Sequence, residues 1–178
     1  MGTSSVQLVA ANSQYVQLPP FSTGSVGMTF SCWFRDDNSG NYARLFEIGN
    51  GEQADNVYLA VLTGDLDVTV WLGSTPDEVI SIPITENTWR HVAWTLGTDN
   101  TWILYFNGVI VWTKTGRSYP NAIIRTKNYI GKSDFASDAY FNGAIDDFRY
   151  YNRLLSPSEV LNIYTSTLNP SLCIAGIG

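Results

Sequence analysis

Apolar residues recur with a period of two in short runs along almost the whole chain, and Gly, Asn, Asp and Pro separate the runs. Successive side chains of a β-strand point to opposite faces, so this alternation is typical of strands that bury one face. The expected strands cover residues 6–10, 15–19, 27–34, 43–49, 57–63, 66–73, 78–84, 88–96, 101–106, 109–114, 127–132 and 144–152. One open sheet rarely exceeds about ten strands. The sequence therefore predicts an all-β sandwich of two stacked antiparallel sheets.

The clearest local signal is ILYFNGVIVW, in which Asn107 and Gly108 stand between two apolar runs. Both residues tolerate the positive φ angles of a type I′ turn, so the segment predicts a β-hairpin. Its strands are apolar on both faces. We therefore expect the hairpin to lie in the middle of a sheet, with its outer side covered.

One short helix is expected near the end of the chain, at SPSEVLNIY. Ser156 can cap the first turn, Pro157 suits the first helical position, and Glu159 completes a capping box three residues after the cap. The face that would dock onto the sandwich holds Val160, Ile163 and Tyr164.

Length and charge limit the possible functions. A chain of 178 residues fits one domain, which we expect over residues 1–166, with a C-terminal tail or linker over residues 167–178. The formal charge is −6 and no basic patch stands out, so nucleic acid is not an expected partner. No apolar run reaches the ~18 residues that span a bilayer, so membrane insertion is not expected either. We expect a domain of a larger secreted or surface protein, extracellular or exposed on a cell or virion.

Four stretches resemble, in the same order, the concanavalin A-like lectin superfamily, specifically its laminin-G-like branch with pentraxin-like features. They are YVQLPPFSTGSVGMTFSCWFR, TWRHVAWTL, ILYFNGVIV and NYIGKSDFASDAYFNGAIDDFRYYNRLLSPSEVLNIY. The resemblance implies a concanavalin A-like jelly-roll β-sandwich with one short C-terminal helix. Domains of this kind are commonly lectins or carbohydrate-binding modules, often with calcium, although the fold alone does not determine function.

The same resemblance implies a calcium site. In pentraxin-like relatives an Asp-Asn pair ahead of one strand meets acidic residues of the loop after "IG", and hard oxygen ligands suit Ca2+. The matching residues here are Asp55, Asn56, Asp134 and Asp138. Lys132 and Ser133 stand where those relatives have Gln and Glu, so one site at most is expected. The alternative reading is that these acids are solvated turn formers.

Four polar residues and one cysteine could be mistaken for catalytic groups. Asp146 and Asp147 are adjacent on a strand and point to opposite faces, so they cannot flank one glycosidic bond. They can instead accept hydrogen bonds from turn amides and pair with Arg149. The histidine, His91, and the cysteine Cys32 are expected to be core residues. Glu47 could be a lone carboxylate on an open sheet face, with no partner that the sequence identifies.

Aromatic residues are the remaining chemical resource, because sugar C–H faces pack on aromatic rings while sugar hydroxyls bind polar groups. Most will be core. The loop and strand-end positions expected to bind ligand are Tyr42, Arg117, Tyr119, Asn121, Phe135 and Tyr140.

The sequence thus predicts a non-enzymatic carbohydrate-binding, lectin-like module. Glycan or polysaccharide would bind at a loop-rimmed site that calcium could assist. The alternative is a structural or protein-interaction domain of a larger surface, adhesin or virion protein without sugar binding. A glycoside hydrolase or lyase would need paired carboxylates, which the sequence does not locate.

Overall fold

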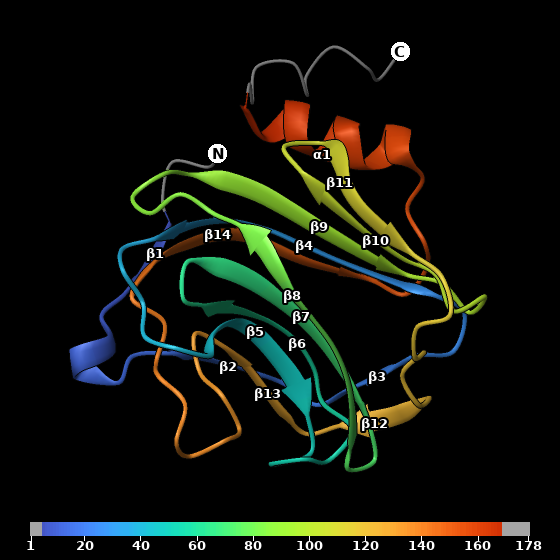
Figure 1. Cartoon of the computed structure of the whole chain (residues 1–178), viewed down its shortest axis with the longest axis horizontal. Helices are drawn as coiled ribbons and strands as arrows, with labels where there is room; N and C mark the ends of the chain where they lie inside the picture. The colour runs from blue at the N-terminus through green and yellow to red at the C-terminus, as the bar shows by residue number, and fades with distance from the viewer. Residues whose placement is uncertain (1–4, 169–178) are drawn as a thin grey trace.

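The computed structural model describes residues 5–168, apart from the side chains of residues 79–81, and Figure 1 shows two sheets stacked face to face. Sheet I has six strands in the order β1 (Val6–Leu8), β14 (Gly143–Tyr151), β4 (Met28–Asp36), β9 (Arg90–Leu96), β10 (Trp102–Phe106) and β11 (Val109–Lys114). Sheet II has six in the order β2 (Val16–Leu18), β13 (Lys127–Ile130), β5 (Ala43–Gly49), β6 (Val57–Leu62), β7 (Asp65–Leu72) and β8 (Thr75–Pro83). Neighbouring strands are antiparallel, which confirms the predicted fold class.

Three short elements were not predicted from the sequence. Strands β3 (Phe21–Thr23) and β12 (Ile123–Arg125) pair with each other as a separate two-stranded sheet. A 3-10 turn, η1 (Ala10–Asn12), connects β1 to β2. Each of these elements has only three residues, which is too few to show a period in the sequence.

The core lies between the two sheets, where alternate residues of both point inward. On β4 the inward residues include Met28, Phe30 and Cys32, all buried. Phe30 stacks on Phe46 of sheet II, with 4.7 Å between ring centroids. Burial raises the pKa of the Cys32 thiol to about 12, so this free cysteine behaves as the small apolar core residue that was predicted.

Helix α1 (Pro157–Leu168) covers the outer face of sheet I (Figure 1). It begins with the predicted capping box: Glu159 N donates to Ser156 Oγ at 3.3 Å, and Ser156 N donates to Glu159 Oε2 at 2.8 Å. Val160, on the face of the helix that packs on sheet I, is fully buried. The helix extends two residues past the expected domain boundary, and the rest of the expected tail, 169–178, lies outside the described residues.

His91 is a packing residue under this helix. Its ring lies 5.5 Å from that of Trp33 and 6.0 Å from that of Tyr164, centroid to centroid. The side chain is 1% exposed, and burial lowers its pKa to about 4. A neutral, enclosed imidazole with no nucleophile beside it matches the structural role predicted for it.

The Asn107–Gly108 hairpin is confirmed, and its predicted position in the middle of a sheet is right for β10 and wrong for β11. Both turn residues have positive φ, 50° and 78°, and join β10 to β11. Strand β11 is the edge of sheet I rather than an inner strand, and Val109, Ile110 and Val111 are exposed. Helix α1 covers the outer face of β9 and β10, where Ala93 and Tyr105 are buried, but its contact with β11 leaves Val109, Ile110 and Val111 exposed. Apolar residues on both faces therefore indicated burial for β10 and not for β11.

The Asp146–Asp147 pair lies at an irregularity in β14. The register with β4 shifts between Asp146 and Arg149, and Asp147 adopts a positive φ of 51°. Arg149 Nε donates to Asp147 Oδ1 at 2.8 Å, which is the pairing expected from the sequence. This contact gives Asp147 a structural role at a β-bulge.

Candidate functional site

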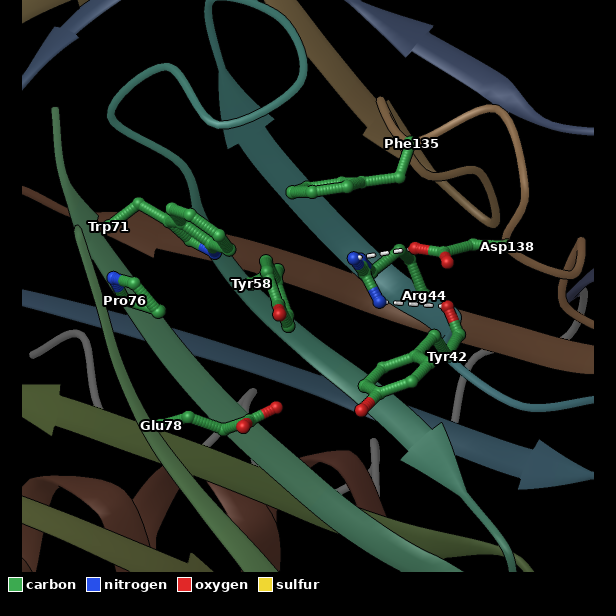
Figure 2. Close-up of a pocket in the computed structure, with 8 residues that line it drawn as sticks. All are labelled: Tyr42, Arg44, Tyr58, Trp71, Pro76, Glu78, Phe135 and Asp138. Atoms are coloured by element: carbon green, nitrogen blue, oxygen red, sulfur yellow. Dashed lines mark hydrogen bonds and ion pairs between the residues drawn. The ribbon is translucent and has the colours of Figure 1, made fainter. Parts of the chain in front are cut away.

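A pocket of about 210 Å³ opens on the outer face of sheet II, opposite the core (Figure 2). Strand alternation places its floor there, because Leu59, Val68 and Val70 point into the core and their neighbours point outward. A loop between β13 and β14 supplies one wall. The lining residues are Tyr42, Arg44, Tyr58, Trp71, Pro76, Glu78, Phe135 and Asp138.

Arg44 of β5 is held at the base of the pocket by three hydrogen bonds. Its Nε donates to Glu47 Oε2 at 2.8 Å, its Nη1 to the Tyr42 carbonyl at 2.8 Å, and its Nη2 to Asp138 Oδ2 at 2.9 Å. The guanidinium carbon lies 3.6 Å from the centroid of the Tyr58 ring. Burial would lower the pKa of Arg44, but Glu47, Tyr58 and Asp138 outweigh it and raise the pKa above its usual value. Arg44 is therefore a fixed cation.

Glu47 is the centre of a buried polar network around this arginine. It is fully buried and also accepts from Asn56 Nδ2 at 2.5 Å, from Ser133 Oγ at 3.2 Å and from the Asp134 amide at 3.2 Å. The loop wall is thus bonded to sheet II through Glu47 as well as through Arg44. Glu47 is not the open, lone carboxylate considered from the sequence.

A second pair of acids lies on β7 and β8. Asp67 is fully buried, Thr69 Oγ1 donates to its Oδ1 at 2.8 Å, and its Oδ2 accepts no hydrogen bond. Burial, and then the charge of Glu78, raise the pKa of Asp67 to about 8. Asp67 is therefore protonated and uncharged at neutral pH, which suits a carboxyl group enclosed in the sheet.

Aromatic rings form most of the pocket's walls (Figure 2). Trp71 and Phe135 are half-buried and touch each other, with 5.5 Å between ring centroids and 46° between ring planes. Tyr42 lines the opposite side and has a positive φ of 57°, which turns the chain just before β5. The result is a shallow hollow with flat apolar walls and a few carboxylates and hydroxyls at its rim.

The structure brings together some of the predicted ligand-binding residues and separates others. Tyr42 and Phe135 line this pocket. Arg117 pairs with Asp77 and donates to the Glu78 carbonyl at 3.1 Å, outside the pocket lining.

The other three predicted residues make structural contacts elsewhere. The Tyr119 hydroxyl accepts from the Gly27 amide at 2.7 Å, Asn121 donates to Asp55 at 2.6 Å, and the Tyr140 ring packs near that of Tyr15. Whether any of these residues binds ligand stays a prediction.

The four predicted calcium ligands come near one another but are already engaged. Asn56 Oδ1 accepts from the Ala54 amide at 2.8 Å, and Asp138 Oδ2 is bonded to Arg44. Asp55 Oδ1 faces away, toward Gly73 and Asn121.

Of the four, Asp134 has the weakest hydrogen bond to its side-chain oxygens. Its Oδ2 lies 3.4 Å from Asn56 Nδ2, so the two loops do converge, and burial followed by the charge of Glu47 raises its pKa to about 6. Within residues 5–168, no group of three or more His, Cys, Asp or Glu is arranged to hold a metal. As arranged, these donors do not fit a Ca2+ shell of six to eight oxygens. Calcium binding stays a prediction.

Sequence reasoning missed most of the pocket. The missed residues are Arg44, Tyr58, Trp71, Pro76 and Glu78. A usable signal exists in LDVTVWL, where Asp67, Thr69 and Trp71 alternate with core residues. Polar and aromatic side chains in that pattern mark a strand face that is not part of the core.

A laminin-G family model, described as the concanavalin A-like lectin/glucanases superfamily, matches residues 10–161. The chain belongs to this superfamily. The sandwich described above is thus a concanavalin A-like jelly roll, as the sequence predicted. No curated protein matches the chain.

Several solved structures share this superfamily fold. Domain 4 of AbnA, an extracellular arabinanase of Geobacillus stearothermophilus, in complex with arabinotriose, has a TM-score of 0.69 at 19% identity and covers 90% of this chain and 76% of its own. The CBM40 domain of the Ruminococcus gnavus IT-sialidase, bound to α2,3-sialyllactose, has 0.67 at 13%, covering 85% and 96%. A SAP-like pentraxin of Limulus polyphemus has 0.62 at 16%, covering 85% and 77%. At these identities the likeness shows the fold alone.

Proposed function

We propose that this chain is a non-catalytic carbohydrate-binding module and that the pocket on sheet II receives a sugar ring. The observation on which the proposal rests is the pair of contacting aromatic rings, Trp71 and Phe135, in a pocket that carboxylate and hydroxyl groups also line. Aromatic faces pack on sugar C–H patches, and the rim groups can bind hydroxyls. A volume of about 210 Å³ is below the roughly 300–1,000 Å³ of drug-sized sites. It suits one ring, with the rest of a chain in solvent.

The comparisons support this proposal without deciding it. Two of the structures with this fold were solved with arabinotriose and with sialyllactose. Glycans of this kind are displayed on cell surfaces and in extracellular polymers, so the proposal includes an extracellular or surface location. The described residues include no helix long and apolar enough to cross a membrane.

The carboxylates of the pocket support binding rather than hydrolysis. Glycosidases commonly need two carboxyl groups about 5–9.5 Å apart, on either side of the scissile bond. Glu47 is enclosed behind Arg44, Asp138 Oδ2 is bonded to Arg44 and Ser133, and Asp67 is fully buried. Of these carboxyl groups and Glu78, Glu78 is the one that is exposed, so two open carboxyl groups are not available to flank a sugar.

A glycan microarray followed by calorimetry tests the proposal. Trp71→Ala should weaken the Kd for the best ligand by at least about tenfold, because a lost stacking platform costs roughly 1–2 kcal/mol. The matched control is Trp89→Ala, a half-buried tryptophan outside the pocket lining, which should bind as the wild type does. Wild-type protein that binds no glycan, or a Trp71→Ala variant with unchanged affinity, would rule the proposal out.

Calcium assistance is tested in the same experiment. Binding and melting temperature are measured with millimolar CaCl2 and with excess chelator. An ion held only by the folded state raises the melting temperature with its concentration. A calcium-dependent rise that Asp134→Asn abolishes would support the predicted site. Identical melting curves would remove calcium from the proposal and leave the pocket unaffected.

A protein-interaction domain is the second candidate, and one feature favours it. The edge strand β11 exposes Val109, Ile110 and Val111 beside unpaired backbone groups, and such edges can pair with another chain. Light scattering after gel filtration would detect self-association. Ile110→Lys should then restore a monomer, and glycan binding that survives in this variant would assign the two functions to different faces.

A further inference from the structure

Arg44 is the one cation among the eight residues that line the pocket, and it is unavailable to a ligand. Its side chain is 1% exposed, and it donates to two carboxylates and one carbonyl. The flat face of the guanidinium is covered by Tyr58 at 3.6 Å. A ligand carboxylate is best held by the open fork of an arginine. No such fork is presented to the pocket.

We propose that this pocket accepts saccharides without acidic groups and rejects those with a carboxylate, sulfate or phosphate at the bound ring. The inference rests on the proposed function, since it names the class of glycan for the same site. It follows from the carboxylates that surround Arg44, taken together with the lack of a free cation in the described lining.

Negative charge outweighs positive charge around the pocket. Glu47 and Asp138 both bond to a single guanidinium, and the exposed Glu78 adds a further carboxylate to the lining. Glu78 is exposed, so a ligand that enters the pocket from solvent meets this carboxylate. An anionic sugar at a few ångströms from these oxygens is repelled even at the effective dielectric of a protein surface.

The nearby basic residues have other partners. The Lys132 ammonium lies 4.6 Å and 4.5 Å from the ring centroids of Tyr15 and Tyr129. Arg117 is paired with Asp77 of β8. Neither residue lines the pocket, so neither replaces Arg44 as an anion anchor.

This charge class separates the pocket from one domain of the same fold. The R. gnavus CBM40 domain was solved with sialyllactose, whose sialic acid has a carboxylate, whereas the AbnA domain was solved with arabinotriose, which is uncharged. The shared fold therefore accommodates both classes. The side chains of this pocket favour the second.

The test is a panel of single-ring probe pairs that differ only in the acidic group: methyl galactoside and methyl galacturonide, methyl glucoside and methyl glucuronide, galactose and galactose 6-sulfate. Calorimetry or microarray signals should be confined to uncharged members, with the acidic partner at least about tenfold weaker. An acidic member that binds as tightly as its partner, and loses binding in Trp71→Ala, overturns this inference while the proposed function stands. If no member of any pair binds, the proposed function fails and the inference fails with it.

Two charge-removing variants locate the effect. Glu78→Gln takes a charge from the pocket rim and should reduce the preference for the uncharged member of a pair by about threefold. Glu86→Gln takes the same charge from an exposed position beyond the end of β8 and should leave the preference unchanged. Equal preferences in the two variants would show that the overall charge of −6, and not this pocket, excludes acidic glycans. That result would also overturn the inference.

Discussion

Replacing Arg44 with methionine tests whether the buried ion network holds the pocket together. Glu47 is fully buried, and Arg44→Met would leave it without its cation. Removing one partner of a buried pair costs roughly 3–5 kcal/mol, because an uncompensated charge remains in the interior. An unfolding entropy of about 2.1 cal/mol/K per residue gives about 0.37 kcal/mol/K for 178 residues. The melting temperature should therefore fall by about 8–13 °C.

The assay is thermal unfolding followed by circular dichroism at pH 7 and again at pH 4. The fall should be smaller at pH 4, because protonation of the abandoned carboxylate removes the buried charge. The double variant Arg44→Met/Glu47→Gln should recover much of the loss at pH 7. The control is Arg153→Met, which breaks a 2.7 Å pair with Glu159 whose side chains are 54% and 41% exposed. Exposed pairs contribute about 1 kcal/mol or less, so it should cost under about 3 °C.

Equal losses in Arg44→Met and Arg153→Met would refute the reasoning. So would a loss that is the same at pH 4 and pH 7, because the cost would then come from packing and not from charge. Either result would mean that water reaches Glu47 in the folded protein. The pocket floor would then be less rigid than the fully buried side chain indicates.

Three further outcomes are expected. Asp67 has a pKa of about 8 in the folded state, raised from 3.8, so its stabilising effect is complete below about pH 4 and is lost as the pH rises to about 8. Asp67→Asn should therefore flatten the dependence of the melting temperature on pH between about pH 4 and 8. Ser156→Ala removes the helix cap and should cost about 1 kcal/mol in denaturant unfolding, whereas Ser158→Ala should cost less. Gly131 has a φ of +83°, and a Cβ there would lie 2.4 Å from Leu8, so Gly131→Ala should lower the denaturation midpoint; wild-type stability would contradict this.

Local patterns in the sequence were sufficient for the framework of the fold. Alternation in VYLAVL predicts β6, Asn107–Gly108 predicts the hairpin, and the Ser156–Glu159 box predicts the start of α1. Each of these signals depends on residues within a few positions of one another. The position of β11 at the edge of sheet I has no such local signal, because it depends on which strands pair with each other across the whole chain.

The pocket depends on long-range contacts in the same way. Alternation shows that Tyr58 and Leu59 face opposite sides, but it does not show which side the other sheet covers. The contact of Arg44 with Asp138 joins positions 94 residues apart, and nothing near either residue announces it. Arg117 was an expected ligand residue because its partner, Asp77, lies 40 residues away and could not be recognised.

The two walls of the pocket differ in how freely they can change. Tyr58 and Trp71 belong to strands whose opposite faces pack the core, so the backbone of this wall is fixed even where an outward side chain is replaced. Phe135 and Asp138 come from a connection that touches sheet II mainly through Arg44 and Glu47. Exchange of that connection, with the arginine and glutamate retained, would give a family of receptors with one scaffold and different preferences. Selection from a library of such loops would be a practical route to new recognition.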